Sequence, residues 1–164
     1  MGTRCGSVDP GAIVTLMEKE KLDADGLNAL LNKKCGLQGV SCVSSDLRDI
    51  EDTFATNENS RLTFEVLGYG IVKYIGAYAA AMDGVDAITF TAGIGENSAH
   101  LRAWVCKRLK NLFGVAIDEA KNAARDKDDR IISTPSSRTT VCVIPTNEEL
   151  MIARYTSGLV GARG

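Results

Sequence analysis

The stretch DAITFTAGIGEN, residues 86–97, decides the fold class of this chain. Its first half is a short run rich in β-favouring residues, typical of a buried strand over residues 86–91. Two glycines, Gly93 and Gly95, then lead into a helix expected over about residues 98–112, with Leu101, Val105, Leu109 and Leu112 on one face. A strand that turns directly into a helix is the building unit of α/β proteins. The sequence therefore predicts an α/β fold, with a few strands and helices packed on them.

The flanking segments add helices before this unit and two further strands after it. Their hydrophobic spacing and their glycine and proline positions place the elements. In chain order we expect helices over 10–20 and 23–34, a glycine-containing connection, a short helix capped by Ser44 or Ser45, a helix over 60–82, strands at 131–133 and 140–144, and a helix opening at Thr146.

The helix over residues 60–82 is amphipathic but rich in small residues. Its apolar stripe is formed by Leu67, Ile71, Tyr74, Ile75, Tyr78 and Met82. Gly68, Gly70 and Gly76 lower helix propensity, and small residues in a helix indicate that another backbone lies close. The expected neighbour is a sheet or a partner subunit.

Composition excludes several classes of protein. The chain has 164 residues, 45% hydrophobic and 24% charged, which suits a packed domain rather than a disordered segment. A net charge of -2 gives no excess of positive charge that would indicate binding to nucleic acid or an anionic membrane. No apolar run reaches a membrane span and the N-terminus has no signal-peptide core, so we expect a cytoplasmic protein.

The cysteine and histidine content bears on disulfides, metal binding and acid-base catalysis. The five cysteines are odd in number and scattered, which predicts free, mostly buried thiols rather than disulfides or a metal cluster. His100 is the single histidine and is expected at the surface. General acid-base chemistry near neutral pH therefore has few candidates in this chain.

The segment Gly93-Ile94-Gly95-Glu96-Asn97 is the strongest candidate for chemistry. A strand ending in glycines before a helix presents unpaired backbone N–H groups, which suit a nucleotide. The alternative is a tight strand-to-helix turn with no ligand. The dinucleotide pattern GxGxxG fails because Ser98 stands at its third glycine, and the P-loop pattern is absent.

Two weaker constellations carry charged residues. Thr146 and Glu149 have capping-box spacing, which leaves Glu148 either to complement the helix dipole or to hold magnesium near phosphates. Arg4 lies in a glycine-flanked loop and Arg48 follows Ser44-Ser45-Asp46-Leu47. An arginine fork suits a phosphoryl group, although most arginines are solvated surface.

Four strings, taken together, resemble the C-terminal half of the acetate kinase family. They are MGTRCGSVDPG, GVSCVSSDLRDIE, KYIGAYAAAMDGVDAITFTAGIGENS and VIPTNEELMIAR, of which the last two are the most specific. The resemblance covers residues 1–156, expected to form an incomplete nucleotide-binding domain. The tail SGLVGARG, residues 157–164, is not part of the resemblance.

The resemblance implies a partial actin-like, ribonuclease-H-like α/β domain with a mixed sheet and packed helices. It also implies an enzyme that transfers a phosphoryl group reversibly between ATP and acetate, giving acetyl phosphate and ADP. It implies Mg²⁺, with Mn²⁺ as a substitute, and homodimers of the full-length protein. Residue by residue, it implies Arg4 as stabiliser of the transferring phosphoryl group and Glu148 as the magnesium-associated glutamate. The nucleotide contacts it implies are Asp46, Leu47, Arg48, Gly93, Ile94, Gly95, Glu96 and Asn97. Ser7 departs from the family's aspartate and receives no role.

The family's N-terminal half has no counterpart in these residues. In the family that half carries the acetate pocket, a catalytic histidine and the HxGNG phosphate loop, and the opening strands of the sheet. We therefore expect a C-terminal segment that binds ATP or ADP weakly and is inactive alone. The alternatives are a propionate or butyrate kinase, or a nucleotide-binding or dimerisation module without catalysis.

Overall fold

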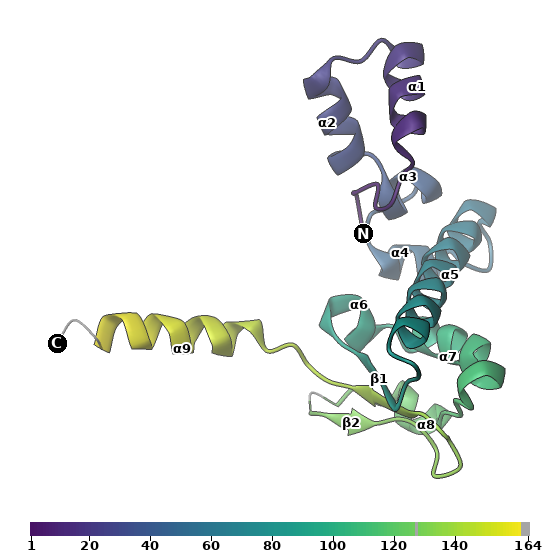
Figure 1. The fold of residues 1–164 in the computed structure, drawn as a ribbon, viewed down its shortest axis with the longest axis vertical. Coiled ribbons are helices and arrows are strands. Elements are labelled where there is room, and N and C mark those ends of the chain that lie inside the picture. Colours follow the sequence, from purple (N-terminus) through teal and green to yellow (C-terminus); the bar gives the residue numbers. More distant parts are fainter. Residues whose placement is uncertain (127, 162–164) are drawn as a thin grey trace. The chain divides into compact units, whose positions relative to one another are not determined.

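The structure is a computed structural model that describes residues 1–126 and 128–161 (Figure 1). It separates the chain into two compact units, Met1–Ala77 and the part from Tyr78 onward. Each unit is described below by itself. The tail expected over 157–164 is described only as far as residue 161, and residues 162–164 lie outside the described residues.

The first unit is helical, and its elements begin at residues that favour helix starts. The helices are α1 (Pro10–Glu20), α2 (Ala24–Lys33), α3 (Gly36–Ser41), α4 (Leu47–Asp52) and α5 (Glu58–Ala81), of which α5 continues into the second unit. The Asp9 carboxylate caps α1 by accepting from the N–H groups of Gly11 and Ala12. The helices predicted over 10–20, 23–34 and 60–82 are confirmed.

Two local predictions in the first unit were wrong. The glycine-containing connection forms the short helix α3, because the left-handed Gly36 (φ 62°) turns the chain after α2 and a new helix starts at once. The cap of α4 is Asp46, which accepts from the N–H of Arg48, and not Ser44 or Ser45. The Ser44 hydroxyl instead donates to Asp49.

The core of the first unit joins α3, α4 and α5. Leu37, Leu47, Ile50 and Phe64 are buried, and Phe64 is wholly inaccessible to solvent. The Phe54 ring meets Phe64 edge to face, with 5.2 Å between centroids. This packing fixes the start of α4, and with it the segment Asp46–Arg48.

The stripe predicted along α5 is half-buried at Leu67, Ile71 and Ile75 and exposed at its other three residues. Tyr74, Tyr78 and Met82 are 48%, 61% and 65% exposed. A Cβ built on Gly70 or Gly76 would meet no atom within 4 Å, so no sheet backbone approaches these two glycines. Of the two expected neighbours, the partner subunit remains a prediction.

The second unit is built on a small mixed sheet. Its elements are β1 (Ala87–Phe90), α6 (Ala92–Asn97), α7 (Ala99–Phe113), α8 (Glu119–Ala123), β2 (Arg130–Ile131), β3 (Thr140–Val143) and α9 (Glu148–Gly161). Within the described residues the strand order is β1-β3-β2. β1 and β3 are parallel, with Ala87 opposite Thr140, whereas β2 and β3 are antiparallel. The predicted α/β class and mixed sheet are confirmed.

The core of the second unit follows the alternation of its strands. Ile88 and Phe90 in β1 are buried, as are Val141 and Val143 in β3. Helix α7 buries Leu101, Val105 and Leu109 as predicted. Its fourth predicted residue, Leu112, is 64% exposed because it lies in the last turn, where the helix ends at the left-handed Gly114.

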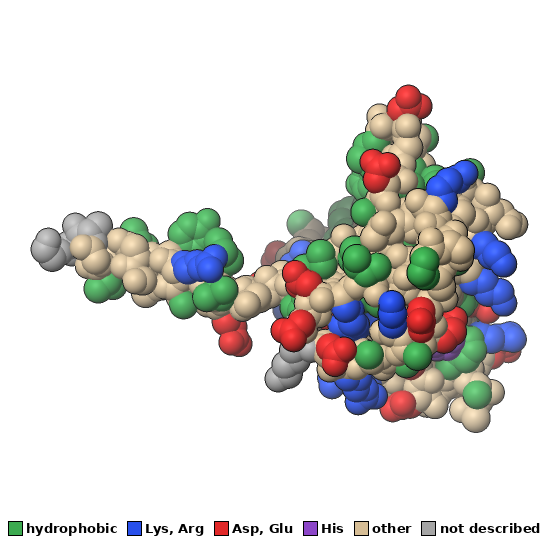
Figure 2. All heavy atoms as spheres, turned by 90° about the horizontal axis from the view of Figure 1, so that it is seen from below, with side chains coloured by type: hydrophobic (Ala, Val, Ile, Leu, Met, Phe, Trp, Pro, Cys, Tyr) green, Lys and Arg blue, Asp and Glu red, His purple; other side chains and the backbone are tan. Residues whose placement is uncertain are grey.

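Helix α9 buries no residue in this structure. Its apolar side chains lie at the surface (Figure 2), with Ile152, Tyr155 and Leu159 each more than 60% exposed. It begins at Glu148, two residues after the predicted opening at Thr146. Among the described residues, none of the helices is both long and apolar enough to cross a membrane.

The thiols are free, but most of them are not buried. Cys106 is buried, Cys5, Cys35 and Cys142 are half-buried, and Cys42 is exposed. The expectation of mostly buried thiols was wrong, because Cys5, Cys35 and Cys42 lie in or beside connections rather than on core faces. His100 is exposed, as expected.

Candidate functional site

The carboxyl edge of the sheet brings two of the predicted segments together. β1 and β3 are parallel neighbours, so their carboxyl ends lie at the same edge, and the N–H of Ile144 donates to the carbonyl of Phe90 across it (3.0 Å). α6 follows one strand and α9 follows the other. In open α/β sheets, ligands bind in the crevice outside this edge.

A glutamate joins the two strand-to-helix turns. The Glu96 carboxylate accepts from the backbone N–H of Thr146 (2.9 Å) and from its hydroxyl (3.0 Å). The Thr146 hydroxyl oxygen also accepts from the N–H of Ala92 (2.9 Å). Glu96, predicted as a nucleotide contact, is therefore occupied in holding the edge together.

The capping box predicted at Thr146 and Glu149 does not form. α9 begins at Glu148, so Thr146 precedes the cap position, and its hydroxyl is engaged by Glu96 and Ala92 instead. Ala92 and Asn147 both have left-handed backbone, with φ of 57° and 49°. Such conformations in residues other than glycine are costly and cluster at functional sites.

The segment Gly93–Asn97 is helical and not the loop that the sequence predicts. It makes up most of α6, in which the Asn97 amide donates to the Gly93 carbonyl (2.8 Å). Its glycines differ: a Cβ on Gly95 would lie 3.2 Å from the carbonyl carbon of Phe90, whereas one on Gly93 would meet nothing within 4 Å. Gly95 is needed for packing against β1, while Gly93 leaves open space beside its backbone. Ile94 is half-buried between them.

A buried arginine from α7 holds the carboxyl end of α6. Arg102 is 2% exposed, and its Nη1 donates to the carbonyls of Gly95 (2.8 Å) and Glu96 (2.9 Å). Its Nε donates to the side-chain oxygen of Asn122 (2.8 Å) and its Nη2 to the Asn122 carbonyl (2.5 Å). Sequence reasoning missed this residue, because an arginine in a helix carries no local sign of whether it is solvated or buried.

Glu148 is exposed at the first residue of α9. Among residues 1–126 and 128–161, no three His, Cys, Asp or Glu side chains are grouped as a metal cage. Mg²⁺ is commonly held by one or two carboxylates together with substrate phosphates. One exposed carboxylate fits an ion that arrives with phosphates and not one enclosed by the protein.

In the first unit, Asp46 and Arg48 pair with each other. The Arg48 guanidinium donates to both Asp46 oxygens, from Nε at 3.0 Å and from Nη2 at 2.5 Å. This hydrogen bonding lowers the pKa of Asp46 to about 2. The Arg48 side chain is 83% exposed. Leu47 between them is 5% exposed and packs in the core, so its side chain anchors the segment.

The loop that carries Arg4 is fixed by backbone contacts. The N–H groups of Leu37 and Gln38 donate to the carbonyls of Met1 (3.1 Å) and Gly2 (2.9 Å). A Cβ on Gly2 would lie 2.8 Å from the Ser45 carbonyl, so this loop runs against the start of the Ser45–Arg48 segment. The Arg4 side chain is exposed. The first unit thus places the loop of Arg4 beside the segment of Arg48.

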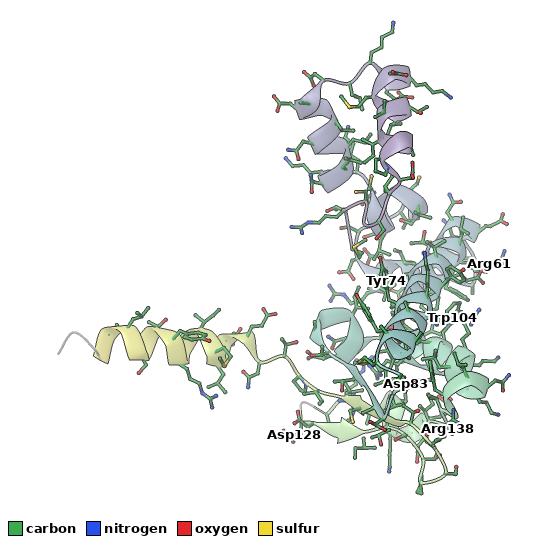
Figure 3. The ribbon with its side chains drawn as sticks, in the orientation of Figure 1. Arg61, Tyr74, Asp83, Trp104, Asp128 and Arg138 are labelled. Atoms are coloured by element: carbon green, nitrogen blue, oxygen red, sulfur yellow. The ribbon has the colours of Figure 1, made fainter. Side chains whose placement is uncertain are left out.

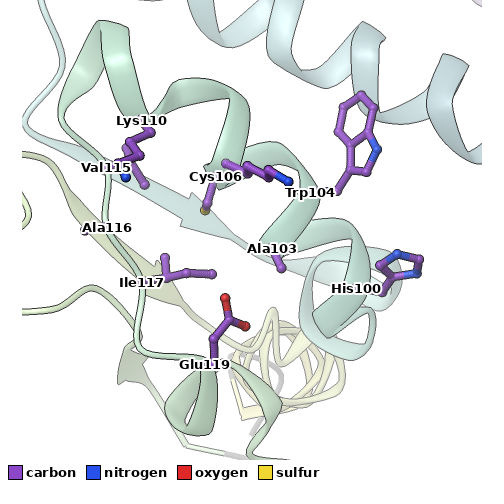
Figure 4. A pocket seen from close by; sticks show the side chains of 10 residues that line it. His100, Ala103, Trp104, Cys106, Lys110, Val115, Ala116, Ile117 and Glu119 are labelled. Atoms are coloured by element: carbon purple, nitrogen blue, oxygen red, sulfur yellow. The ribbon is translucent and has the colours of Figure 1, made fainter.

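The second unit has an open hollow of about 470 Å³ (Figure 4). Its walls include His100, Trp104, Lys110 and Glu119, and none of the residues predicted to bind nucleotide lines it. The Arg108 guanidinium lies 3.0 Å from the centroid of the Trp104 ring, a cation–π contact.

Comparison with known proteins identifies the family. The fold and the strand–helix edge define an α/β protein with a small mixed sheet. The model of the acetokinase family matches residues 1–154. Acetate kinases of Thermosipho melanesiensis and Carboxydothermus hydrogenoformans are 52% and 53% identical to this chain, and each alignment covers 98% of this chain and 40% of the relative. The chain belongs to the acetokinase family.

Solved structures agree with this assignment. Porphyromonas gingivalis acetate kinase is 48% identical, with a TM-score of 0.88 over 98% of this chain and 40% of that chain. A propionate kinase from Francisella tularensis is 33% identical, with a TM-score of 0.82 over 93% of this chain and 38% of that chain. The fold is consistent with a partial actin-like ATPase fold. The chain spans about 40% of the length of the curated relatives it matches.

Proposed function

We propose that this chain forms the nucleotide side of an acetate kinase, an enzyme that transfers a phosphoryl group between ATP and acetate to give ADP and acetyl phosphate. Support comes from the acetokinase family match and from acetate kinases about half identical over nearly the whole chain. The complete protein is proposed to act in the cytoplasm as a homodimer.

One observation carries the proposal most directly. The carboxyl edge of the sheet joins Gly93–Asn97 to the start of α9 through Glu96 and Thr146, and Gly93 keeps open space beside its backbone. A nucleotide phosphate needs such close approach to backbone N–H groups, which a side chain would block. Glu148, two residues after Thr146, is exposed near the same turn.

The proposed residues have separate tasks. Gly93–Asn97 and Asp46–Arg48 bind the nucleotide, and Arg4 neutralises charge on the transferring phosphoryl group. Glu148 holds Mg²⁺, or Mn²⁺ in its place, and the ion neutralises phosphate charge when bound. Phosphoryl transfer depends on positioning and charge neutralisation more than on covalent chemistry, so arginines, a glutamate and backbone groups suffice on this side.

The acetate side is proposed to lie in the part of the relatives that this chain does not span. The 164-residue chain should then bind ADP or ATP weakly and form no acetyl phosphate. Purified chain incubated with ATP, Mg²⁺ and acetate tests this. Acetyl phosphate formation by the chain alone would refute the proposal that the acetate side lies outside this chain.

Nucleotide binding is tested by calorimetric titration of ADP with Mg²⁺ into the chain and its Gly93→Ala variant. The added methyl meets no protein atom, so the fold should be unchanged, while a phosphate against the backbone is displaced. The matched control is Gly158→Ala in α9, where a Cβ also meets nothing within 4 Å. Equal ADP affinity of Gly93→Ala and the unmodified chain, or no binding by the unmodified chain at millimolar ADP, would refute the proposal.

A propionate kinase is the second candidate, because a propionate kinase structure aligns over 93% of this chain. Discrimination between short carboxylic acids is proposed to lie outside this chain. The kcat/KM values of the full-length protein on acetate, propionate and butyrate distinguish the candidates. A higher value for propionate than for acetate would replace the acetate assignment.

A further inference from the structure

Arg102 is a charged side chain in the interior of the second unit. It is 2% exposed, among the largest fully buried side chains. Burying a guanidinium is unfavourable unless its N–H groups are satisfied. Its partners here are specific: two carbonyls at the end of α6 and both oxygens of Asn122 in α8.

The two carbonyls belong to the segment proposed to face the nucleotide. The last carbonyls of a helix have no partner within the helix, and a cation there complements the negative end of the dipole. α6 has only six residues, so most of its carbonyls depend on outside donors. Arg102 serves Gly95 and Glu96, while Gly95 also lies against the backbone of Phe90 on the β1 side.

The Nε and Nη2 atoms of Arg102 are held by Asn122. Asn122 is 2% exposed, accepts from Nε and Nη2 of Arg102, and donates to the Ala99 carbonyl at the start of α7 (2.9 Å). The amide therefore holds the guanidinium and the helix that carries it. Within the part of the chain that the structure describes, the Asn122 side chain bonds to Arg102 and Ala99 and not to Gly93–Asn97, so its influence on that segment passes through Arg102.

We propose that Arg102 is a positioning residue that holds Gly93–Asn97 in its nucleotide-binding conformation, and that Asn122 is its anchor. The inference rests on the proposed function for what the segment binds, but the positioning itself does not depend on it. Loss of the guanidinium frees the carbonyls of Gly95 and Glu96, and the segment then samples conformations in which Gly93 is misplaced.

The variants are Arg102→Lys, Arg102→Met and Asn122→Ala, with Arg138→Met as matched control. Arg138 caps the end of another helix: its Nη2 donates to the Leu112 carbonyl (2.6 Å) and its Nε to that of Phe113 (3.3 Å) (Figure 3). The control thus removes the same chemistry from the end of α7, without touching α6. Arg102→Lys keeps the charge and tests whether charge alone suffices.

Amide hydrogen exchange gives the first readout, because it needs no ligand. The amides of residues 95–98 should exchange about tenfold faster or more in Arg102→Met and Asn122→Ala, and at the original rate in Arg138→Met. In Arg102→Lys these amides should exchange faster than in the unmodified chain but more slowly than in Arg102→Met. Unchanged exchange at residues 95–98 in both Asn122→Ala and Arg102→Lys would overturn the proposal, even if Arg102→Met fails to fold.

ADP affinity gives the second readout. Asn122→Ala should weaken ADP binding about tenfold and Arg102→Lys less, and the double variant should lose less than the product, because both act through one contact. Arg138→Met should bind ADP normally. Faster exchange with unchanged ADP affinity would overturn the link to the nucleotide. Absence of ADP binding by the unmodified chain would refute the proposed function, and exchange would still decide the positioning role.

Discussion

Replacing Gly36 by alanine should detach the loop that carries Arg4. Gly36 has a φ of 62°, where an alanine costs about 1 to 2 kcal/mol. Its Cβ would overlap the carbonyl oxygen of Met1 and lie 2.9 Å from that of Arg4. The overlap involves backbone on both sides, so the loop must move away as a unit.

The magnitude follows from the contacts that are lost. Moving the loop breaks the bonds from Leu37 to Met1 (3.1 Å), from Gln38 to Gly2 (2.9 Å) and from Cys35 to Thr3 (3.0 Å). At about 1 kcal/mol each, with the backbone term, the loop loses about 4 kcal/mol. Opening of the loop should then be about 700-fold more frequent, since 1.4 kcal/mol is a factor of ten.

Amide hydrogen exchange at Leu37 and Gln38 measures this opening, since both amides donate to the loop. The matched control is Gly70→Ala in α5, where the added methyl meets nothing and alanine raises helix stability by about 1 kcal/mol. Unchanged exchange of both amides in Gly36→Ala would refute the reasoning. Faster exchange in the Gly70→Ala control would show that the assay reports general loosening instead.

Further predictions concern Cys106, Asp46 and Glu148. Burial raises the pKa of Cys106 to about 12, so a thiol reagent should modify the exposed Cys42 and spare Cys106 until the second unit unfolds. Because the unfolded thiol ionises near 9, the stability of that unit should fall as pH rises from about 9 towards 12; a denaturation midpoint that stays level over this range would contradict it. The hydrogen bond from the neighbouring guanidinium lowers the pKa of Asp46 to about 2, so its NMR titration should have its midpoint there, and the cap is lost as pH falls through that value. Glu148→Gln should weaken the Mg²⁺ dependence of ADP binding and leave thermal stability unchanged because the side chain is exposed, whereas Glu149→Gln should change neither; equal effects of the two variants would count against a metal role for Glu148.

Much of the local structure is readable from the sequence because it depends on near neighbours. The strand before Gly93, the helix after Ser98 and the long helix over 60–82 follow from hydrophobic periodicity, and all three are present. The start of α1 at Pro10 follows from the fit of proline to the first turn of a helix. Such elements need no knowledge of what packs on them.

The candidate site was predicted only in part. Its segments were identified by family resemblance, but the bonds between Glu96 and Thr146 across the sheet edge were not predicted, and Thr146 was assigned to a helix cap instead. Residues 50 apart in the chain interact there because β1 and β3 are adjacent and parallel, and pairing of strands is not encoded in either segment alone.

The sequence by itself determined the α/β class, most helices and strands, and the family to which the chain belongs, because periodicity and motifs are local properties. Only the tertiary structure decided that Gly93 is open while Gly95 is packed, that Leu47 is a core residue, and that the buried Arg102 holds the end of α6. The physical reason is that burial, steric space and hydrogen-bond partners are properties of segments brought together in space. A guanidinium in a helix can be solvated or buried, and its surroundings alone distinguish the two.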